Sequence, residues 1–498
     1  MTYKNDALRT GRNTTETVLT TANVSSATFG LLHNLSVDGK VDAQPLYLSQ
    51  LTVAGASHNV VFVATENDSV YAFDADSGAL LWKVSLLGAG ETTSDAHSCN
   101  QVTPQIGVTS TPVIDRNAGA HGTLFVVAMT EDTSSAYHQR LHALDVTTGA
   151  EATASPTDIT ATYMGTVFSP GVYEERAALL LLNGTIYTSW TSHCDQAPYG
   201  GWVIAYAETS LAQTGVINLA AGATGFGYGT AGPAIWMAGG GPAADAAGNV
   251  YILMANGAFE TTLNAGGFPT LGDYGNSFVK LSVSGGPLTV SDYFALKNGP
   301  AESAADQDLG SGGIMLLPDL TDGSGTVRHL AVGAGKDTNL YVVNRDSMGK
   351  FSASANNIWQ ELDGALPGEV FSTPAYFNNV VYYGTASGPL RAFSVTNAQL
   401  SSSSVAQTPT SFGFPGTLPV VSANGTANGI VWAYENATPA VLHAYDATNL
   451  THELYNSNQA ANARDNFGAG NKFIAPTVAD GKVFVGTTNS VGVFGLLP

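Results

Sequence analysis

The feature that most constrains this chain is an internal repeat that recurs eight times along its 498 residues. Each copy contains a short alternating segment that ends in an apolar–aromatic pair and a turn, as in VYAFDADSG at 70–78. The other copies are LHALDVTTG (141–149), VIAYAETS (203–210), FVKLSVSGG (278–286), LYVVNRDSMG (340–349), LRAFSVTN (390–397), LHAYDATN (442–449) and VGVFG (491–495). A long internal period of this kind indicates an array of structural units, each burying its apolar surface against its neighbours.

Two further β-rich runs accompany these segments. One precedes every copy: VVFVAT (60–65), TLFVVAM (123–129), TIYTSW (185–190), NVYILMA (249–255), HLAVGAG (329–335), VVYYGT (380–385), GIVWAY (429–434) and KVFVGT (482–487). A third, often containing proline, lies upstream in six repeats: AQPLYL at 43, STPVID at 110, GGPAAD at 240, STPAYF at 372, LPVVSA at 418 and APTVAD at 475. With an outer strand such as LLWKVS (80–85), each repeat has about four strands, which is typical of a propeller blade.

These repeats predict an all-β protein, an eight-bladed β-propeller of four-stranded blades that forms a single domain over 1–498. The chain ends after its eighth inner pair without a fourth strand, and FGLLHNLSV at 29–37 is a strand without a blade of its own. We therefore expect this N-terminal strand to close the last blade, which removes a free sheet edge. Residues 1–28 are then an N-terminal extension, and 29–498 form the blades.

Composition excludes several classes of protein. Hydrophobic residues make up 44% and charged residues 11% of the chain, which excludes intrinsic disorder. The 18 Lys and Arg against 39 Asp and Glu give a net charge of −21. A chain this acidic has no basic surface for phosphates, so we expect no nucleic-acid partner.

The longest strongly apolar run, 177–182, is far shorter than the roughly 20 residues that cross a bilayer, so we also expect no membrane span. The 56 glycines, few lysines and two cysteines resemble those of secreted or periplasmic bacterial proteins. We expect an exported monomer from which any export signal has been removed.

The motif V-x-V-A-T-x-x-x-x-V-Y-A-F-D-A-x-S-G-x-x-L-W at 61–82 resembles the repeat of pyrroloquinoline quinone (PQQ) proteins. The eight-fold count and GKDTNLYVVNR at 335–345 are similar to the PQQ-dependent alcohol and methanol dehydrogenase family. This resemblance implies PQQ near the central axis, stacked between a tryptophan and a disulfide, with Ca²⁺ or a lanthanide beside it. It also implies oxidation of an alcohol or a sugar.

The resemblance assigns roles to individual residues. Trp236, which precedes NVYILMANG, matches the tryptophan that supports the cofactor, and Lys336 matches the basic residue on the quinone oxygens. Asp308, with Asp306 beside it in ADQDLGSGG, matches the catalytic aspartate. The residues that match metal ligands are Asp195, if its loop is one residue longer than in the family, Asn256 and Asp308.

The sequence also departs from the family. Adjacent cysteines are absent, and only Cys99 and Cys194 are present, so the resemblance implies a single bridge between them at the cofactor rim. No C-x-x-C-H motif occurs, so we expect no covalent haem and an external electron acceptor. Gly310 stands where the family's lanthanide enzymes carry a further aspartate, which favours Ca²⁺.

Other interpretations of the same residues remain open. Trp236 also suits blade packing, Asn256-Gly257 suits a hairpin turn, and Asp306 and Asp308 suit turn formation. His97 and His193 flank the cysteines, so a His–Cys cluster for a transition metal is an alternative to a purely structural bridge.

The fold itself leaves the function open, because scaffold proteins of the outer-membrane assembly type use the same repeat without a cofactor. The alternative to an enzyme is a cofactor-free extracellular propeller that binds glycan or protein, or that serves as a structural scaffold.

Overall fold

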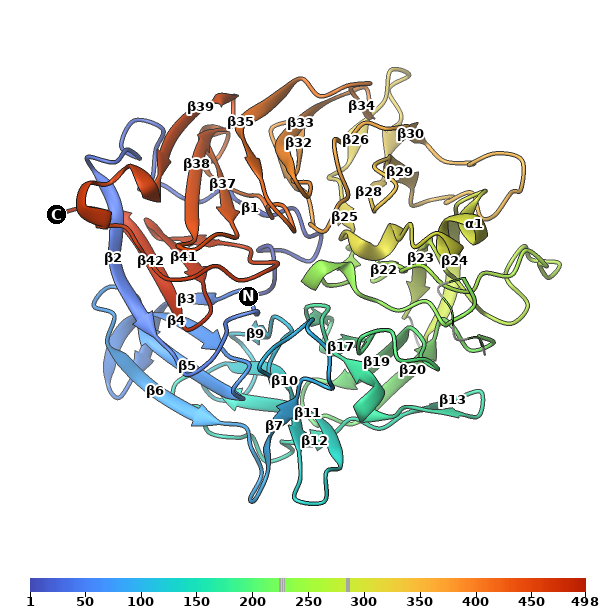
Figure 1. The fold of residues 1–498 in the computed structure, drawn as a ribbon, viewed down its shortest axis with the longest axis horizontal. Helices are drawn as coiled ribbons and strands as arrows, with labels where there is room; N and C mark the ends of the chain where they lie inside the picture. Colours follow the sequence, from blue (N-terminus) through green and yellow to red (C-terminus); the bar gives the residue numbers. More distant parts are fainter. Residues whose placement is uncertain (224, 226, 228, 284–286) are drawn as a thin grey trace.

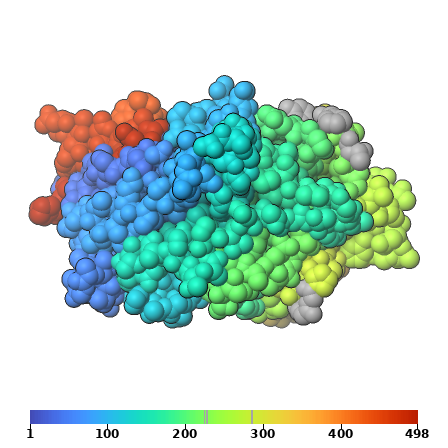
Figure 2. All heavy atoms as spheres, turned by 90° about the horizontal axis from the view of Figure 1, so that it is seen from below, coloured from blue at the N-terminus to red at the C-terminus, as the bar shows by residue number. Residues whose placement is uncertain are grey.

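The computed structural model describes residues 1–498 except 224, 226, 228 and 284–286, so the last residues of the 278–286 repeat segment lie outside the description. Eight small antiparallel sheets lie in a ring around a central axis (Figure 1). Seen from the side, the ring is a thick disc whose consecutive segments follow one another along the rim (Figure 2). The predicted eight-bladed propeller is confirmed.

The first four blades follow one another along the chain, each running from an innermost to an outermost strand. They are β3 (Leu46–Val53), β4 (Ala56–Ala64), β5 (Ser69–Asp74) and β6 (Leu80–Ser85); β9 (Val113–Asp115), β10 (Thr123–Glu131), β11 (Tyr137–Asp145) and β12 (Thr157–Asp158); β16 (Leu180–Leu182), β17 (Thr185–Ser189), β19 (Trp202–Ala207) and β20 (Gln213–Asn218); and β21 (Ala243–Ala244), β22 (Val250–Leu253), β23 (Ser277–Ser282) and β24 (Thr289–Ala295).

Blades five to eight follow the same order. They are β25 (Met315–Leu316), β28 (Leu330–Gly333), β29 (Leu340–Asn344) and β30 (Gln360–Leu362); β31 (Ala375–Phe377), β32 (Val380–Tyr383), β33 (Gly388–Thr396) and β35 (Ala406–Phe412); β36 (Val420–Asn424), β37 (Ala427–Glu435), β38 (Val441–Asp446) and β39 (Asn449–Asn456); and β40 (Thr477–Ala479), β41 (Lys482–Gly486), β42 (Ser490–Leu496) and β2 (Phe29–Ser36).

Further short elements are present in addition to these four-stranded blades. They are β1 (Arg12–Asn13), β7 (Thr92–Asp95), β8 (Gln105–Ile106), β13 (Thr162–Tyr163), β14 (Thr166–Val167), β15 (Tyr173–Glu174), β18 (Thr191–Ser192), β26 (Leu320–Thr321), β27 (Val327–Arg328), β34 (Gln399–Leu400) and the helix α1 (Gly299–Ala304). Within the described residues, no helix is long and apolar enough to cross a membrane.

Two innermost strands lie outside the six proline-containing runs that the sequence singled out. These are β16, within the apolar run 177–182, and β25, which follows a glycine-rich loop. Both are short, so their strand pattern is too brief to separate from the flanking loop.

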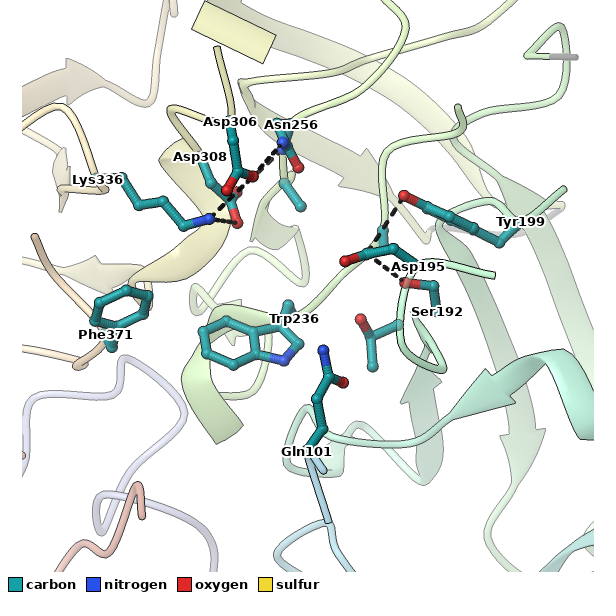
Figure 3. A pocket seen from close by; sticks show the side chains of 13 residues that line it. Gln101, Ser192, Asp195, Tyr199, Trp236, Asn256, Asp306, Asp308, Lys336 and Phe371 are labelled. Carbon is teal, nitrogen blue, oxygen red and sulfur yellow. Dashed lines mark hydrogen bonds and ion pairs between the residues drawn. The ribbon is translucent and has the colours of Figure 1, made fainter. Parts of the chain in front are cut away.

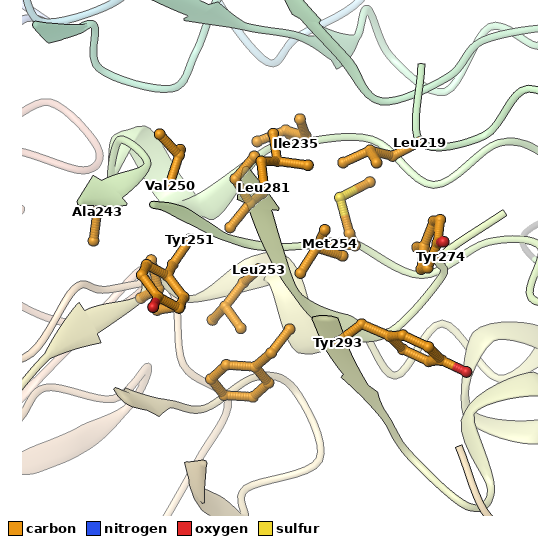
Figure 4. Packing of buried hydrophobic residues seen from close by; sticks show 14 of the residues in the cluster. Leu219, Ile235, Ala243, Val250, Tyr251, Leu253, Met254, Tyr274, Leu281 and Tyr293 are labelled. Carbon is orange, nitrogen blue, oxygen red and sulfur yellow. The ribbon is translucent and has the colours of Figure 1, made fainter. Parts of the chain in front are cut away.

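The core lies between blades. Each blade is covered on both faces by its neighbours, so a middle strand such as β22 is buried at all four positions. Leu253, Leu281 and Tyr293 of the fourth blade all belong to the largest apolar cluster (Figure 4). Outer strands differ: β6 has no fully buried residue.

The ring closes through both ends of the chain, as the sequence predicted. Strand β2 pairs antiparallel with β42, in a register that runs from Phe29 opposite Leu496 to Ser36 opposite Ser490. Blade eight therefore contains three C-terminal strands and one N-terminal strand, and its outer edge is supplied by β2.

The first sixteen residues lie along the inside of the ring, and the N-terminus lies near its centre (Figure 1). They form backbone hydrogen bonds with the innermost strands of four consecutive blades. The carbonyls of Ala7, Leu8, Thr10 and Gly11 accept from Ala244, Leu316, Tyr376 and Val421 at 2.7–2.9 Å. The extension is therefore part of the propeller's centre.

Two cations of this segment are fully buried. Arg9 donates from Nε to Pro242 O at 3.0 Å and from Nη2 to Leu179 O at 3.1 Å. Lys4 Nζ donates to the carbonyls of Thr373, at 3.1 Å, and Pro419. These carbonyls precede the innermost strands of four blades, so the two cations join blades three, four, six and seven.

We predict that Arg9→Met destabilises the fold by about 3 kcal/mol or more, because it leaves several buried carbonyls without a donor. Chemical denaturation with an unchanged m-value measures the loss. The control is Arg116→Met, since Arg116 is exposed and makes one hydrogen bond, to Gln50 O; we expect a change within about 0.5 kcal/mol. Equal losses in the two variants would contradict the role of Arg9.

Candidate functional site

Topology brings the candidate residues to one face of the ring. In an antiparallel blade, the start of the innermost strand and the loop between the second and third strands lie at the same end. The segment 191–199 and Asn256 lie in such loops, while Trp236, Asp308 and Phe371 precede innermost strands. The side chains therefore meet although they come from different blades.

These loops enclose one pocket (Figure 3). Its lining residues are Gln101, Thr191, Ser192, Asp195, Tyr199, Ala234, Trp236, Ala255, Asn256, Asp306, Asp308, Lys336 and Phe371. Of the seven residues that the sequence assigned to cofactor, metal and proton transfer, five line this pocket, namely Trp236, Lys336, Asp195, Asn256 and Asp308, whereas Cys99 and Cys194 do not. The structure therefore brings these five residues together in one cavity.

One wall of the pocket is a cluster of two carboxylates, an amide and a lysine. The backbone N–H of Asn256 donates to Asp308 Oδ1 at 3.0 Å, and its side-chain amide donates to Asp306 Oδ1 at 2.9 Å. Lys336 Nζ lies 3.1 Å from Asp306 Oδ1 and 3.9 Å from Asp308 Oδ2. The amide oxygen of Asn256 is not used in these contacts and is available to a ligand.

Asp308 is the most perturbed member of this cluster. Its side chain is buried, and burial raises its pKa to about 6, while the positive charge of Lys336 acts in the opposite direction. The carboxylates of Asp306 and Asp195 add to the increase in pKa. This group is therefore poised to take up or release a proton near neutral pH.

The backbone around Asp308 is closely packed. A side chain at Gly310 would bring its Cβ to 2.4 Å from the backbone nitrogen of Ala255, and one at Gly335 would meet the carbonyl oxygen of Asp308 at 2.2 Å. Both positions therefore require glycine. A further carboxylate at position 310, expected in the lanthanide enzymes, cannot enter here without a shift of the backbone.

Asp195 lies on the other side of the pocket (Figure 3). Its Oδ1 accepts from Ser192 Oγ at 3.1 Å and from Tyr199 Oη at 3.4 Å. Cys194 and Asp195 both have positive φ, 51° and 53°, so the loop turns sharply here. The two anionic walls, Asp195 and the Asp306–Asp308 pair, thus face the same cavity.

Trp236 stands between this pocket and a second, smaller cavity, and lines both. Its ring meets the rings of Phe371 and Phe473 edge-on, with centroids 6.0 Å and 5.1 Å apart. The indole is half-buried. It therefore offers an aromatic surface held in place by two other rings.

The second cavity is lined by two basic side chains, Arg176 and Lys472. Arg176 is 5% exposed, lies over Phe473 with Cζ 4.7 Å from the ring centroid, and donates from Nη1 to Asp42 at 3.2 Å. Its Nε has no hydrogen-bond partner among the described residues. Lys472 is beside it, and burial, followed by the charge of Arg176, lowers its pKa. A buried, unpaired donor next to a second cation favours an anionic ligand.

The two cysteines form the predicted bridge, Cys99–Cys194, with Cα atoms 6.2 Å apart. The bond joins the segment before β8 to the loop between β17 and β19, and so links blades two and three. Gln101 and Asp195, two of the pocket residues, lie within two residues of the cysteines. The disulfide is therefore beside the pocket, although its sulfur atoms do not line it.

Sequence reasoning missed several lining residues, among them Gln101, Ser192, Tyr199, Phe371 and Arg176. Arg176 and Phe371 lie shortly before innermost strands, and Ser192 and Tyr199 lie in the loop after the second strand of blade three. Gln101 lies in the connection between blade one and blade two. Their position relative to the repeat was the available signal, because equivalent loops of all blades meet on one face.

Three comparisons relate the chain to known proteins. A family profile described as outer membrane protein assembly factor BamB, of the PQQ repeat type, matches residues 36–152. No protein of curated function matches the sequence significantly.

Solved structures with a similar fold include two quinohemoprotein alcohol dehydrogenases. The enzyme from Pseudomonas putida HK5 has a TM-score of 0.64 at 15% identity, over 100% of this chain and 80% of that one. The enzyme from Comamonas testosteroni has a TM-score of 0.65 at 14% identity, over 99% and 80%. A europium-containing methanol dehydrogenase has a TM-score of 0.63 at 15% identity, over 98% and 96%.

These identities are low, so the likeness establishes the fold and leaves the chemistry to the site. With the eight-fold repeat, it confirms that the chain is an eight-bladed propeller of the PQQ type, with the fold that these quinoprotein dehydrogenases share.

Proposed function

We propose that this chain is an exported bacterial quinoprotein dehydrogenase that oxidises an alcohol or a sugar with PQQ and Ca²⁺. One observation carries the proposal: loops of three blades bring two anionic walls, a lysine and a half-buried tryptophan to a single pocket. No run of neighbouring residues produces this arrangement, since its members come from positions between 101 and 371.

The oxygen donors suit Ca²⁺. Asp195, the free amide oxygen of Asn256 and Asp308 supply two carboxylates and a carbonyl, and Ca²⁺ takes six to eight oxygen ligands in flexible geometry. The raised pKa of Asp308 indicates that its negative charge lacks full compensation from Lys336 alone. A cation between the two walls would supply that compensation.

The surroundings also suit a planar anionic cofactor. Trp236 offers an aromatic surface, and Arg176 and Lys472 offer positive charge on its far side, including the unpaired Arg176 Nε. Bound PQQ would supply a quinone that accepts a hydride from the substrate. The residues that would hold it are Trp236, Lys336 and the two cations of the second cavity, with the Cys99–Cys194 bridge at the rim.

The chain's own chemistry centres on Asp308. A carboxylate with a pKa of about 6 is ionised at neutral pH and is more basic than an ordinary aspartate, so it suits removal of a substrate hydroxyl proton. Lys336 remains charged beside it and can polarise an acceptor oxygen. The electrons would then leave through an external acceptor, because no covalent haem motif is present.

One observation favours the alternative of a cofactor-free module for glycan or protein. The disulfide joins separate loops of two blades, so it does not provide the platform of adjacent cysteines that the family stacks on its cofactor. A binding test with the cofactor distinguishes the two functions directly.

We predict that the purified protein retains PQQ through gel filtration when Ca²⁺ is present, with a quinone absorbance that elutes with the protein. Trp236→Ala and Lys336→Ala should each weaken binding at least about tenfold, because each removes a direct contact. Trp359→Ala is the matched control, since Trp359 lies on the outer side of blade five and packs under Arg328. Unchanged binding in all three variants, or none in the wild type, would favour the cofactor-free module.

A second prediction concerns stability without ligands. Asp308 has a higher pKa in the folded chain than its ordinary value of 3.8, so the folded state binds more protons between pH 4 and 6 and loses stability as the pH rises through this range. Asp308→Asn removes this loss. From pH 4 to pH 7, the unfolding free energy of the variant minus that of the wild type should therefore increase by about 3 kcal/mol.

Denaturation curves at the two pH values measure this change. The pH 4 curve is the internal control, because the carboxyl is mainly neutral there. A difference between the proteins that does not vary with pH would show that Asp308 titrates normally.

A further inference from the structure

We propose that reduction of the Cys99–Cys194 disulfide creates a site for a soft divalent cation, Zn²⁺, with Cys99, Cys194 and His193 as its ligands. The site adjoins the pocket described above, and none of its ligands lines that pocket.

The three ligand atoms are already together. The two sulfurs and a ring nitrogen of His193 lie within 4.8 Å of one another, and His193 Nε2 is 3.7 Å from Cys194 Sγ. Two thiolates and an imidazole are ligands that Zn²⁺ prefers, and three protein ligands leave one tetrahedral position for water. The nearest competitor for Nε2 is the carbonyl of Ala96, at 3.4 Å.

The histidine is oriented as in known metal sites. Its ring is 1% exposed, and its other nitrogen, Nδ1, faces Glu174 Oε2 at 3.5 Å. In the part of the chain that the structure describes, neither Nδ1 nor Glu174 Oε1 has a hydrogen-bond partner. Metal-bound histidines commonly direct their second nitrogen to a carboxylate, which fixes the ring. Shortening this contact would satisfy Nδ1, a buried atom that the oxidised form leaves unpaired.

The neighbouring side chains enclose the site without competing for it. His97 packs against His193 with ring centroids 4.2 Å apart and stacks on Tyr137. Its Nε2 lies 3.1 Å from Ser94 Oγ, so His97 is a wall of the site and not one of the three ligands. Both cysteines belong to loops that a metal would hold together in place of the disulfide.

The site forms in two steps, reduction of the disulfide and then binding of Zn²⁺. A dithiol reductant passes two electrons and two protons to the disulfide, which becomes two thiols while the reductant becomes a disulfide. Zn²⁺ then displaces the two thiol protons and binds the thiolates, so binding releases two protons to solution. The site is therefore specific to the reduced protein.

The test uses the full-length chain, reduced with dithiothreitol and desalted without oxygen. Co²⁺, as a spectroscopic probe, should bind once per chain with a thiolate-to-cobalt charge-transfer band, and Zn²⁺ should displace it. Oxidised protein should show no such band. Glu174→Gln should weaken binding about 10- to 100-fold, as for other outer-shell partners, and His193→Gln by more. His121→Gln, a change of an exposed histidine paired with Asp145, is the matched control and should bind normally.

A second measurement does not rely on variants. In the reduced wild type, Zn²⁺ should protect both thiols from iodoacetamide, and two protons should be released per Zn²⁺ bound. Equal alkylation with and without Zn²⁺, or a cobalt spectrum that His193→Gln leaves unchanged, overturns the proposal. Neither readout involves PQQ, so a failure here leaves the proposed dehydrogenase untouched, and the converse also holds.

Discussion

The structure depends on hydrogen-bond partners for the backbone groups at the centre of the ring. Each innermost strand of a propeller has a partner on one side only, so its other edge presents unpaired N–H and C=O groups to the axis. Residues 1–16 supply the missing partners for blades four to seven, and Lys4 and Arg9 bind carbonyls at the start of four innermost strands. The buried cations are tolerated because oriented carbonyls surround them.

The same geometry positions the candidate site. Part of the pocket lining lies before innermost strands, close to carbonyls that Lys4 and Arg9 bind. Thr373 connects the two regions: its carbonyl accepts from Lys4, and Phe371, two residues earlier, packs edge-on against Trp236. The pocket loops are therefore attached to strands that buried hydrogen bonds hold in place. Precise positioning of carboxylates requires such rigid support.

Much of this was predictable from the sequence, and the reason is periodicity. The repeat predicts eight blades and the closing strand 29–37, because equivalent positions in a repeat occupy equivalent places in a ring. The resemblance to the PQQ-dependent family, and not the repeat, is what singles out Trp236, Asn256, Asp308 and Lys336. Other features depend on contacts between distant segments. The sequence pattern predicts an N-terminal extension over residues 1–28, since nothing local indicates that Lys4 and Arg9 are buried. Arg176 likewise carries no motif, and only its position beneath Trp236 makes it relevant.

Closure of blade eight has a consequence for how the chain is made. Strand β2 pairs with β42, more than 450 residues later, so the ring cannot close until residues 490–496 have been synthesised. The delay costs little at equilibrium, because the entropy of closing a loop grows only with the logarithm of its length, by about 0.6 kcal/mol for each doubling. Its cost is kinetic. Until the last blade forms, β2 remains an unpaired edge, and the seven earlier blades form an open arc whose two ends are open to other chains.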